Sequence, residues 1–410
     1  MFAGEIPKPA KMATVSGHIS DRQHYIDWLR VILIVSVYLF HVGMIFNTWQ
    51  WHIKNDVLYG GLLREVMIFL HVWRMPLLFM ISGAGTWYAL RRISPARYLA
   101  GRAKRLLIPL AAGIFLLVPV QVYIERIDQY PSLLAYYPHM FEGVYPDGNF
   151  SWHHLWFIAY LFVMALMISP FLNLLRSARF MAGVGTMERI LVQPLGMNII
   201  IIPLLVSQII LRIFFEEETH GLIDDWATYT FYLIFFLAGF ILLPVRSIAE
   251  SMTRNRRLYL LESAVAVALM IMVREQAQSV RTAEVIYDVS EIILSWTCAV
   301  TVTGYARKYL NKNTRFRQIA NEAIYPFYLL HQPALVITGY LIVSLTIPVY
   351  WKVILVMLTS LSLIISVYWF LIRPFSVMRL LFGMKPLRKR ENDASVPVTA
   401  AGTAPDAARA

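Results

Sequence analysis

Charged residues and cysteine are scarce in this chain. Of its 410 residues, 15% are charged and 58% are hydrophobic, whereas about 25% charged residues are usual in a soluble domain. This composition excludes a soluble globular protein and equally a disordered one. The single cysteine, Cys298, excludes a disulfide framework and any cysteine-rich metal site.

Acidic residues are outnumbered as well. The chain has 37 Lys and Arg against 25 Asp and Glu, a net charge of +12. One basic patch would indicate a nucleic-acid partner. The bases instead lie in many short segments between apolar runs, so we expect no nucleic acid and predict a lipid bilayer as the surroundings.

Long apolar runs are abundant. A helix crosses a hydrocarbon core of about 30 Å with roughly 18–25 residues, and the runs are continuous rather than alternating as in a strand barrel. The sequence therefore predicts an all-α polytopic membrane protein with about ten transmembrane helices. The predicted spans are 28–47, 66–90, 106–124, 154–175, 199–215, 228–248, 258–273, 285–305, 324–346 and 348–372.

The positions of the basic residues predict the topology. With both termini in the cytoplasm, 29 of the 37 Lys and Arg fall in inner segments and 5 in outer loops, as the positive-inside rule requires. We predict a membrane domain over residues 21–385, flanked by disordered segments at 1–20 and 386–410.

The few charged residues inside the predicted spans are candidate functional residues, because each costs about 2.5–3.5 kcal/mol or more at the bilayer centre. Arg30 and His41 are eleven residues apart on the first span, so they share one helix face at about 16 Å separation. Arg30 lies at the cytoplasmic mouth, where it could also be an ordinary positive-inside anchor. His41 reaches about the middle of the membrane.

The second and ninth spans carry polar residues at a similar depth. Arg74 lies about 12 Å from the outer end of its span, and His71 is one turn away from it. His331 lies about 11 Å from the inner end of the ninth span. We expect these three residues to approach one central cavity together with His41. Alternatively, a membrane histidine makes a single interhelical hydrogen bond that serves packing.

Other polar residues have two interpretations each. Ser82 is either a reactive hydroxyl or, as we favour, part of a Ser-Gly pair that suits close helix packing. His154 can both accept and donate a proton, and alternatively belongs to an interfacial aromatic belt. We predict no metal site beside it, since no third ligand is near. The acidic loop 216–225 is predicted to be a solvated face.

An inner loop is rich in arginine. These residues serve either as a topology determinant that contacts anionic lipid or as a phosphate site for a soluble donor, since arginine makes bidentate phosphate contacts. The arginines concerned are Arg91, Arg92, Arg102 and Arg105.

Five motifs in order resemble the integral-membrane acyltransferase-3 family over about residues 21–385. The R-x10-H signature of that family matches Arg30 and His41. The motifs are RVILIVSVYLFH (30–41), FLHVWRMPLLFMISG (69–83), RAKRLLIP (102–109), HLWFI (154–158) and YPFYLLHQP (325–333). Within the family, TWQWHI (48–53), VWRM (72–75) and LLFGMKPLRKREND (380–393) resemble a subfamily that modifies osmoregulated periplasmic glucans.

The resemblance implies an acyltransferase for groups other than amino-acyl groups, in a bacterial inner membrane. It would move a succinyl or acetyl group from cytosolic acyl-CoA to a hydroxyl of a periplasmic or cell-surface glycan, with no bound cofactor. His41 would be the general base, and Arg74 would stabilise an oxyanion or pair with a succinyl carboxylate. Arg30 and the inner arginines would hold donor phosphates.

The second-tier candidates have supporting roles in this reaction. His331 and His154 would bind the acceptor or relay a proton. Direct transfer and a covalent acyl-enzyme both remain open, and Ser82 would be the serine of an acyl-enzyme.

A transporter or flippase for an acylated glycan or an acyl donor is the alternative. Buried histidine and arginine are common to both classes. The ordered motifs favour the enzyme, and the missing internal repeat disfavours a transporter.

Overall fold

The structure is a bundle of helices, which confirms the all-α prediction. The computed structural model describes residues 23–90, 93–175 and 177–387. The predicted disordered segments lie outside these ranges, except for residues 386–387. The α-helices are α1 (His24–Phe46), α2 (Leu62–Leu90), α3 (Pro95–Leu116), α4 (Val118–Glu125), α5 (Leu133–Tyr136), α6 (Trp156–Ile168), α7 (Leu172–Leu175), α8 (Ala178–Leu191), α9 (Ile201–Leu211), α10 (Trp226–Leu242), α11 (Arg246–Val273), α12 (Arg281–Tyr309), α13 (Arg315–Val343), α14 (Val349–Ser366) and α15 (Ser376–Leu381).

Short turns complete the described elements. They are the 3-10 helices η1 (Tyr137–His139), η2 (His153–Leu155), η3 (Ser169–Phe171), η4 (Gly196–Ile200) and η5 (Gln276–Gln278), and the π-helix η6 (Val367–Ile372).

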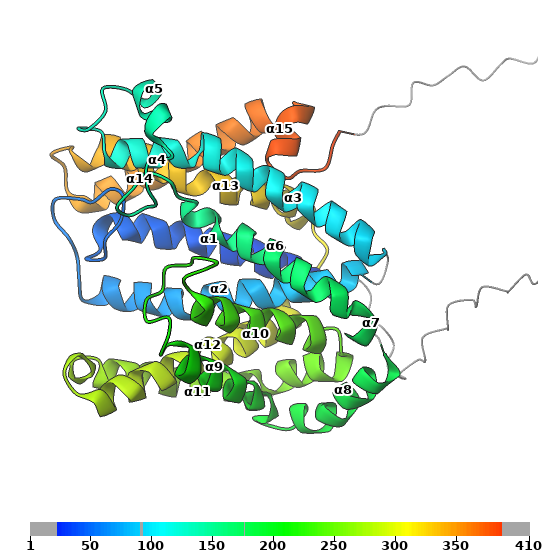
Figure 1. Cartoon of the computed structure of the whole chain (residues 1–410). Helices are drawn as coiled ribbons and strands as arrows, with labels where there is room; N and C mark the ends of the chain where they lie inside the picture. Colours follow the sequence, from blue (N-terminus) through cyan, green and yellow to red (C-terminus); the bar gives the residue numbers. More distant parts are fainter. Residues whose placement is uncertain (1–22, 91–92, 176, 388–410) are drawn as a thin grey trace, which may run out of the picture.

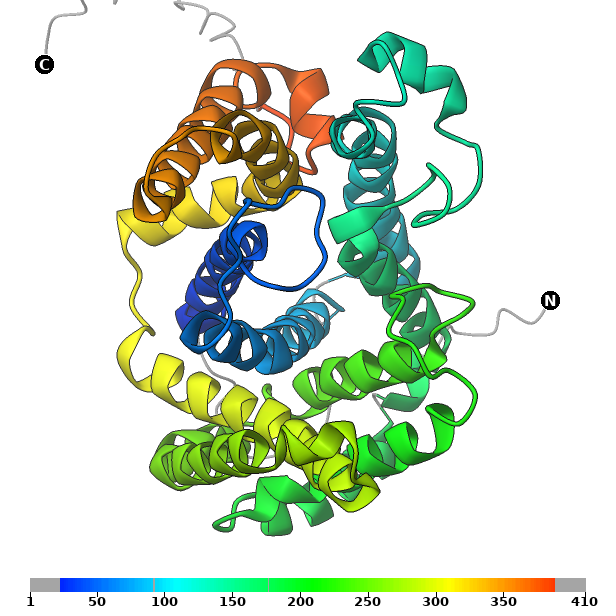
Figure 2. The ribbon, with the colours of Figure 1, turned by 90° about the vertical axis from the view of Figure 1, so that its left-hand side faces the viewer.

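Helices α1 and α2 lie in the middle of the bundle. Viewed from the side, most of the long helices run roughly along one axis (Figure 1). Viewed along that axis, the other helices surround α1 and α2 (Figure 2). Helix α1 contacts α2, α12, α13 and α14, whereas α2 also contacts α3, α6 and α10. Polar residues on the covered faces of α1 and α2, such as Arg74, are therefore enclosed by protein.

The structure supports seven or eight of the ten predicted spans. Among the described residues, seven helices or helix pairs are long and apolar enough to cross a membrane, and the pair α10 and α11, bent by 112°, would add an eighth. Three predicted spans fall short individually. The run at 199–215 folds as a short apolar helix, Gly196–Leu211. Helix α10 ends at Leu242. The first turns of α11 contain basic residues, so the apolar part of this helix is short.

Two glycines let α2 and α10 approach closely. A Cβ on Gly83 would lie 1.9 Å from the backbone oxygen of Phe236, and one on Gly239 would lie 1.7 Å from that of Met80. Only glycine leaves room for such contact between backbones. The Ser-Gly motif of the second span therefore has a packing role through its glycine.

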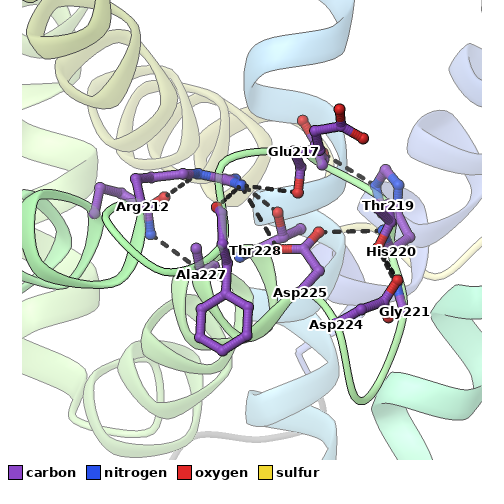
Figure 3. A network of polar contacts seen from close by, with 12 residues as sticks. Arg212, Glu217, Thr219, His220, Gly221, Asp224, Asp225, Ala227 and Thr228 are labelled. Atoms are coloured by element: carbon purple, nitrogen blue, oxygen red, sulfur yellow. Dashed lines mark hydrogen bonds and ion pairs between the residues drawn. The ribbon is translucent and has the colours of Figure 1, made fainter.

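The acidic loop between α9 and α10 is ordered, so its prediction as a solvated face was wrong in part. Asp225 is fully buried; its carboxylate accepts hydrogen bonds from the backbone N–H groups of Thr228 and His220. Arg212 lies 3.6 Å from Asp225 and donates to the Thr228 hydroxyl at 2.7 Å (Figure 3). The loop also holds Glu218, 3.0 Å from Nε2 of His220. Ion pairing and a helix cap explain why these acids are not simply solvated.

Candidate active site

Two histidines from distant parts of the chain meet inside the bundle. Nδ1 of His41, on α1, lies 2.9 Å from Nε2 of His331, on α13, and the ring centroids are 5.1 Å apart. His331 is completely buried, and its Nδ1 is within hydrogen-bonding distance of the backbone oxygen of Tyr328. The ring of Trp51 stacks on His41 at 5.9 Å. The packing therefore joins two predicted spans through a bond between imidazoles.

Arg74 places a buried charge beside this pair. Its side chain is 3% exposed, and its Nε and Nη1 atoms have no hydrogen-bond partner among the described residues. The guanidinium carbon lies 4.0 Å from the centroid of the Phe40 ring, and that ring lies 5.6 Å from the ring of His41. A buried charge without a partner is costly. The site is therefore suited to an anion or to a developing negative charge.

His154 lies against the other side of His331, with ring centroids 5.0 Å apart. Its Nε2 donates to the backbone oxygen of Leu329 at 3.2 Å. That oxygen is available because Pro333, four residues later, has no N–H to donate within the helix. At 7% exposure, His154 belongs to the buried cluster and not to an interfacial belt.

His52, at the end of α1 opposite Arg30, is a site residue that was not among those predicted from the sequence. Nδ1 of His52 lies 2.6 Å from the carboxylate of Glu125, and its Nε2 lies 2.9 Å from Nε2 of Gln332. The Tyr145 hydroxyl donates to the same carboxylate at 3.1 Å. The only available signal was the density of aromatic residues and histidine in TWQWHI. A carboxylate and a histidine joined in this way form a polar rim at this end of the site.

Lys54 stabilises the loop that carries His52 through hydrogen bonds to backbone oxygens. Its Nζ donates to the backbone oxygens of Met44, at 2.6 Å, and Trp49, at 2.8 Å. Burial lowers the pKa of Lys54 to about 8. A second lysine, Lys352 of α14, donates to the side-chain oxygen of Asn55 at 3.0 Å. The carbonyl oxygens at the end of α1 and the loop are thereby tied to the bundle.

Arg30 lies at the other end of α1, among further arginines. Its guanidinium donates to Asn321 at 3.1 Å and to Asp27 at 3.3 Å, and the charges of Arg102 and Arg105 act on it. Asp27 is shared, since it also pairs with Arg317. Arg102 donates to the Tyr98 and Thr86 hydroxyls. Positive charge is therefore concentrated here. Arg91 and Arg92, the other two predicted donor-binding residues, lie outside the described residues.

Two predicted site residues, His71 and Ser82, form their polar contacts away from the pair of His41 and His331. His71 packs on the ring of Phe40 at 5.9 Å and lies 4.0 Å from the carboxylate of Glu218. The Ser82 hydroxyl donates to the backbone oxygen of Leu78 in its own helix at 2.7 Å. The structure therefore brings His331, His154 and Arg74 to His41, and directs His71 toward the acidic loop.

The fold and the site define a multi-pass membrane protein with a pair of bonded imidazoles, of which His331 is fully buried, near an arginine that has two buried donor atoms without a partner among the described residues. Residues 23–373 match the model of the acyltransferase domain, so the chain belongs to the acyltransferase-3 family. Membership of this family implies transferase activity.

Known relatives match over a shorter stretch. The chain is similar to glucans biosynthesis protein C of Salmonella paratyphi B and of Salmonella heidelberg, with 27% identity over 153 residues. The match covers 35% of this chain and 38% of each relative. No solved structure matches the chain.

Proposed function

We propose that this protein is an O-acyltransferase of a bacterial inner membrane. It transfers a succinyl or acetyl group from cytosolic acyl-CoA to a hydroxyl of a periplasmic or cell-surface glycan. The observation that carries the proposal is the bonded pair of His41 and His331 beside the unpaired charge of Arg74, in a chain of this family. The similarity to glucans biosynthesis protein C supports a glucan as acceptor.

His41 acts as general base through Nε2, the ring nitrogen that does not face His331. It takes the proton of the acceptor hydroxyl while the hydroxyl oxygen attacks the thioester carbonyl carbon. A C–O bond forms, the C–S bond breaks, and the proton passes to the departing sulfur to give free thiol. A positioned base of this kind contributes about 10²–10⁴-fold to the rate.

Arg74 stabilises negative charge in this reaction. Its free donors suit the oxyanion of the tetrahedral intermediate. With a succinyl donor, they also suit the distal carboxylate. We favour direct transfer to the acceptor over an acyl-enzyme on Ser82, because the Ser82 hydroxyl is bonded within its own helix.

The donor enters from the end of the bundle that carries Arg30. Arg30, Arg102 and Arg105 concentrate positive charge there, which suits the phosphates of coenzyme A. The opposite end, with His52 and Glu125, faces the acceptor.

Replacing His41 tests the proposal. Purified wild-type protein should release free thiol from acyl-CoA when glucan is added, and mass spectrometry should detect the acylated glucan. His41→Ala should lower the rate by at least about 10²-fold. His139→Ala, which removes a half-exposed imidazole from an outer loop, should match wild type. Glucan binding without thiol release would indicate a transporter instead, and a fully active His41→Ala would refute the mechanism.

A further inference from the structure

The hydrogen bonds around His331 determine where its proton lies. The Tyr328 carbonyl oxygen can only accept, so Nδ1 of His331 carries the hydrogen of that bond. A neutral imidazole has one N–H, which leaves Nε2 of His331 as an acceptor. The Nδ1 atom of His41, 2.9 Å away, must therefore be the donor of the second bond. By the same count, Nε2 of His41 holds the free lone pair.

We propose that His331 is a positioning residue that keeps His41 in the tautomer whose Nε2 can accept a proton. The inference rests on the proposed function, since it concerns the base of that reaction. The Tyr328 carbonyl orients His331, and His331 orients His41. When the acceptor hydroxyl gives its proton to Nε2, the bond from Nδ1 to His331 also stabilises the resulting imidazolium.

Within the described part of the chain, His331 has no polar contact other than those with Tyr328 and His41. It is fully enclosed, and its two nitrogens are both used, one by Tyr328 and one by His41. The neighbouring His154 is anchored separately, on Leu329. The second nitrogen of His331 is therefore committed to His41 alone.

Substitutions at position 331 separate an acceptor role from a packing role. The amide oxygen of His331→Gln reaches about as far as Nε2, so it can accept from His41. His331→Asn is polar but too short, and His331→Phe keeps the ring without an acceptor. Loss of an orienting partner leaves a catalytic histidine in the wrong tautomer, at a cost of up to about 10⁴-fold in kcat in a serine protease.

The test measures kcat and KM for thiol release with each variant. We expect His331→Phe and His331→Asn to lower kcat by about 10²-fold or more, with KM within about threefold. His331→Gln should retain kcat within about tenfold of wild type. The control is Thr338→Val, which removes a buried hydroxyl from α13 and should leave kcat unchanged. Thermal unfolding in detergent checks that each variant is folded.

Two results would overturn the inference. One is a kcat for His331→Phe within about threefold of wild type; the other is a loss in His331→Gln as large as that in His331→Phe. Either result together with an inactive His41→Ala would refute the role of His331 alone. Absence of acyl transfer by the wild type would refute the proposed function, and the inference with it.

Discussion

Arg74 is buried, and two of its donor atoms, Nε and Nη1, have no hydrogen-bond partner among the described residues. Its burial therefore lowers the stability of the fold. Replacing Arg74 with Met removes the cost of an unpaired buried charge. We expect Arg74→Met to raise the Tm in detergent by about 2 °C or more. The rate of thiol release should fall by about 10²–10³-fold, the cost of losing one oxyanion donor. Thermal unfolding and the thiol assay measure the two effects on one preparation.

The comparison of donors separates the two roles of Arg74. If it holds a distal carboxylate, Arg74→Met raises KM for succinyl-CoA and leaves KM for acetyl-CoA unchanged. If it stabilises the oxyanion, kcat falls for both donors. Arg74→Lys retains the charge without the fork of donors and should be intermediate. A Tm that falls together with activity would show that Arg74 is structural.

Glu218 makes the stability of the protein depend on pH through the acidic loop. Partial burial raises the pKa of its carboxyl, but contacts with His220 and His71 outweigh this and hold that pKa well below its ordinary value near 4.5. Its contribution to stability is therefore present above about pH 4.5 and is lost as the pH falls through the lowered value. Glu218→Gln should reduce the fall in Tm between about pH 5 and pH 3.

Glu217→Gln is the matched control for that measurement, because it changes an adjacent carboxylate in the same loop. Its Tm should depend on pH as the wild type does. Equal pH dependence in Glu218→Gln and wild type would mean that these contacts contribute nothing to stability.

At the scale of elements, the contact between α2 and α10 depends on glycine. Gly239→Ala would place a methyl group 1.7 Å from the Met80 backbone oxygen, so the helices must separate. We expect a loss of about 1–3 kcal/mol in the free energy of unfolding. Gly185→Ala in α8, where nothing lies within 4 Å of the added Cβ, should be neutral or slightly stabilising. Equal effects at both positions would contradict the close contact.

One segment of α13 organises much of the site. Its residues 328–333 contact three histidines from other parts of the chain, namely His41, which is bonded to His331, and His154 and His52. Tyr328 and Leu329 provide backbone acceptors to His331 and His154, and Gln332 contacts His52. The sequence motif indicated that this segment matters, and the proline at 333 explains one free carbonyl. Which histidines it would meet depended on the packing of other helices.

For the whole molecule, the proposed donor and acceptor sites lie at opposite ends of the bundle. Donor binding and acceptor binding can therefore be tested separately. Arg102→Ala with Arg105→Ala removes charge near Arg30 and should raise KM for acyl-CoA by about tenfold or more, with little change for glucan. Arg97→Ala with Lys104→Ala removes two exposed charges from the same helix and is the control. Equal donor kinetics in the two double variants would leave the inner arginines only a role in topology.

The sequence by itself determined the class of fold, because apolar runs of this length are stable only as helices in a membrane. It also identified His41, Arg74 and His331 as costly intramembrane groups. The sequence predicted ten spans where the described residues support seven or eight, because hydropathy does not reveal where an apolar run is short or bent.

Only the tertiary structure decided which groups meet. Depth along a helix follows from the rise per residue, but the rotation of one helix against another is set by packing contacts far apart in sequence. This is why the bond between His41 and His331, 290 residues apart, was not predictable. The same reason explains His52, which reaches the site because a loop folds back onto the bundle and two lysines hold it there.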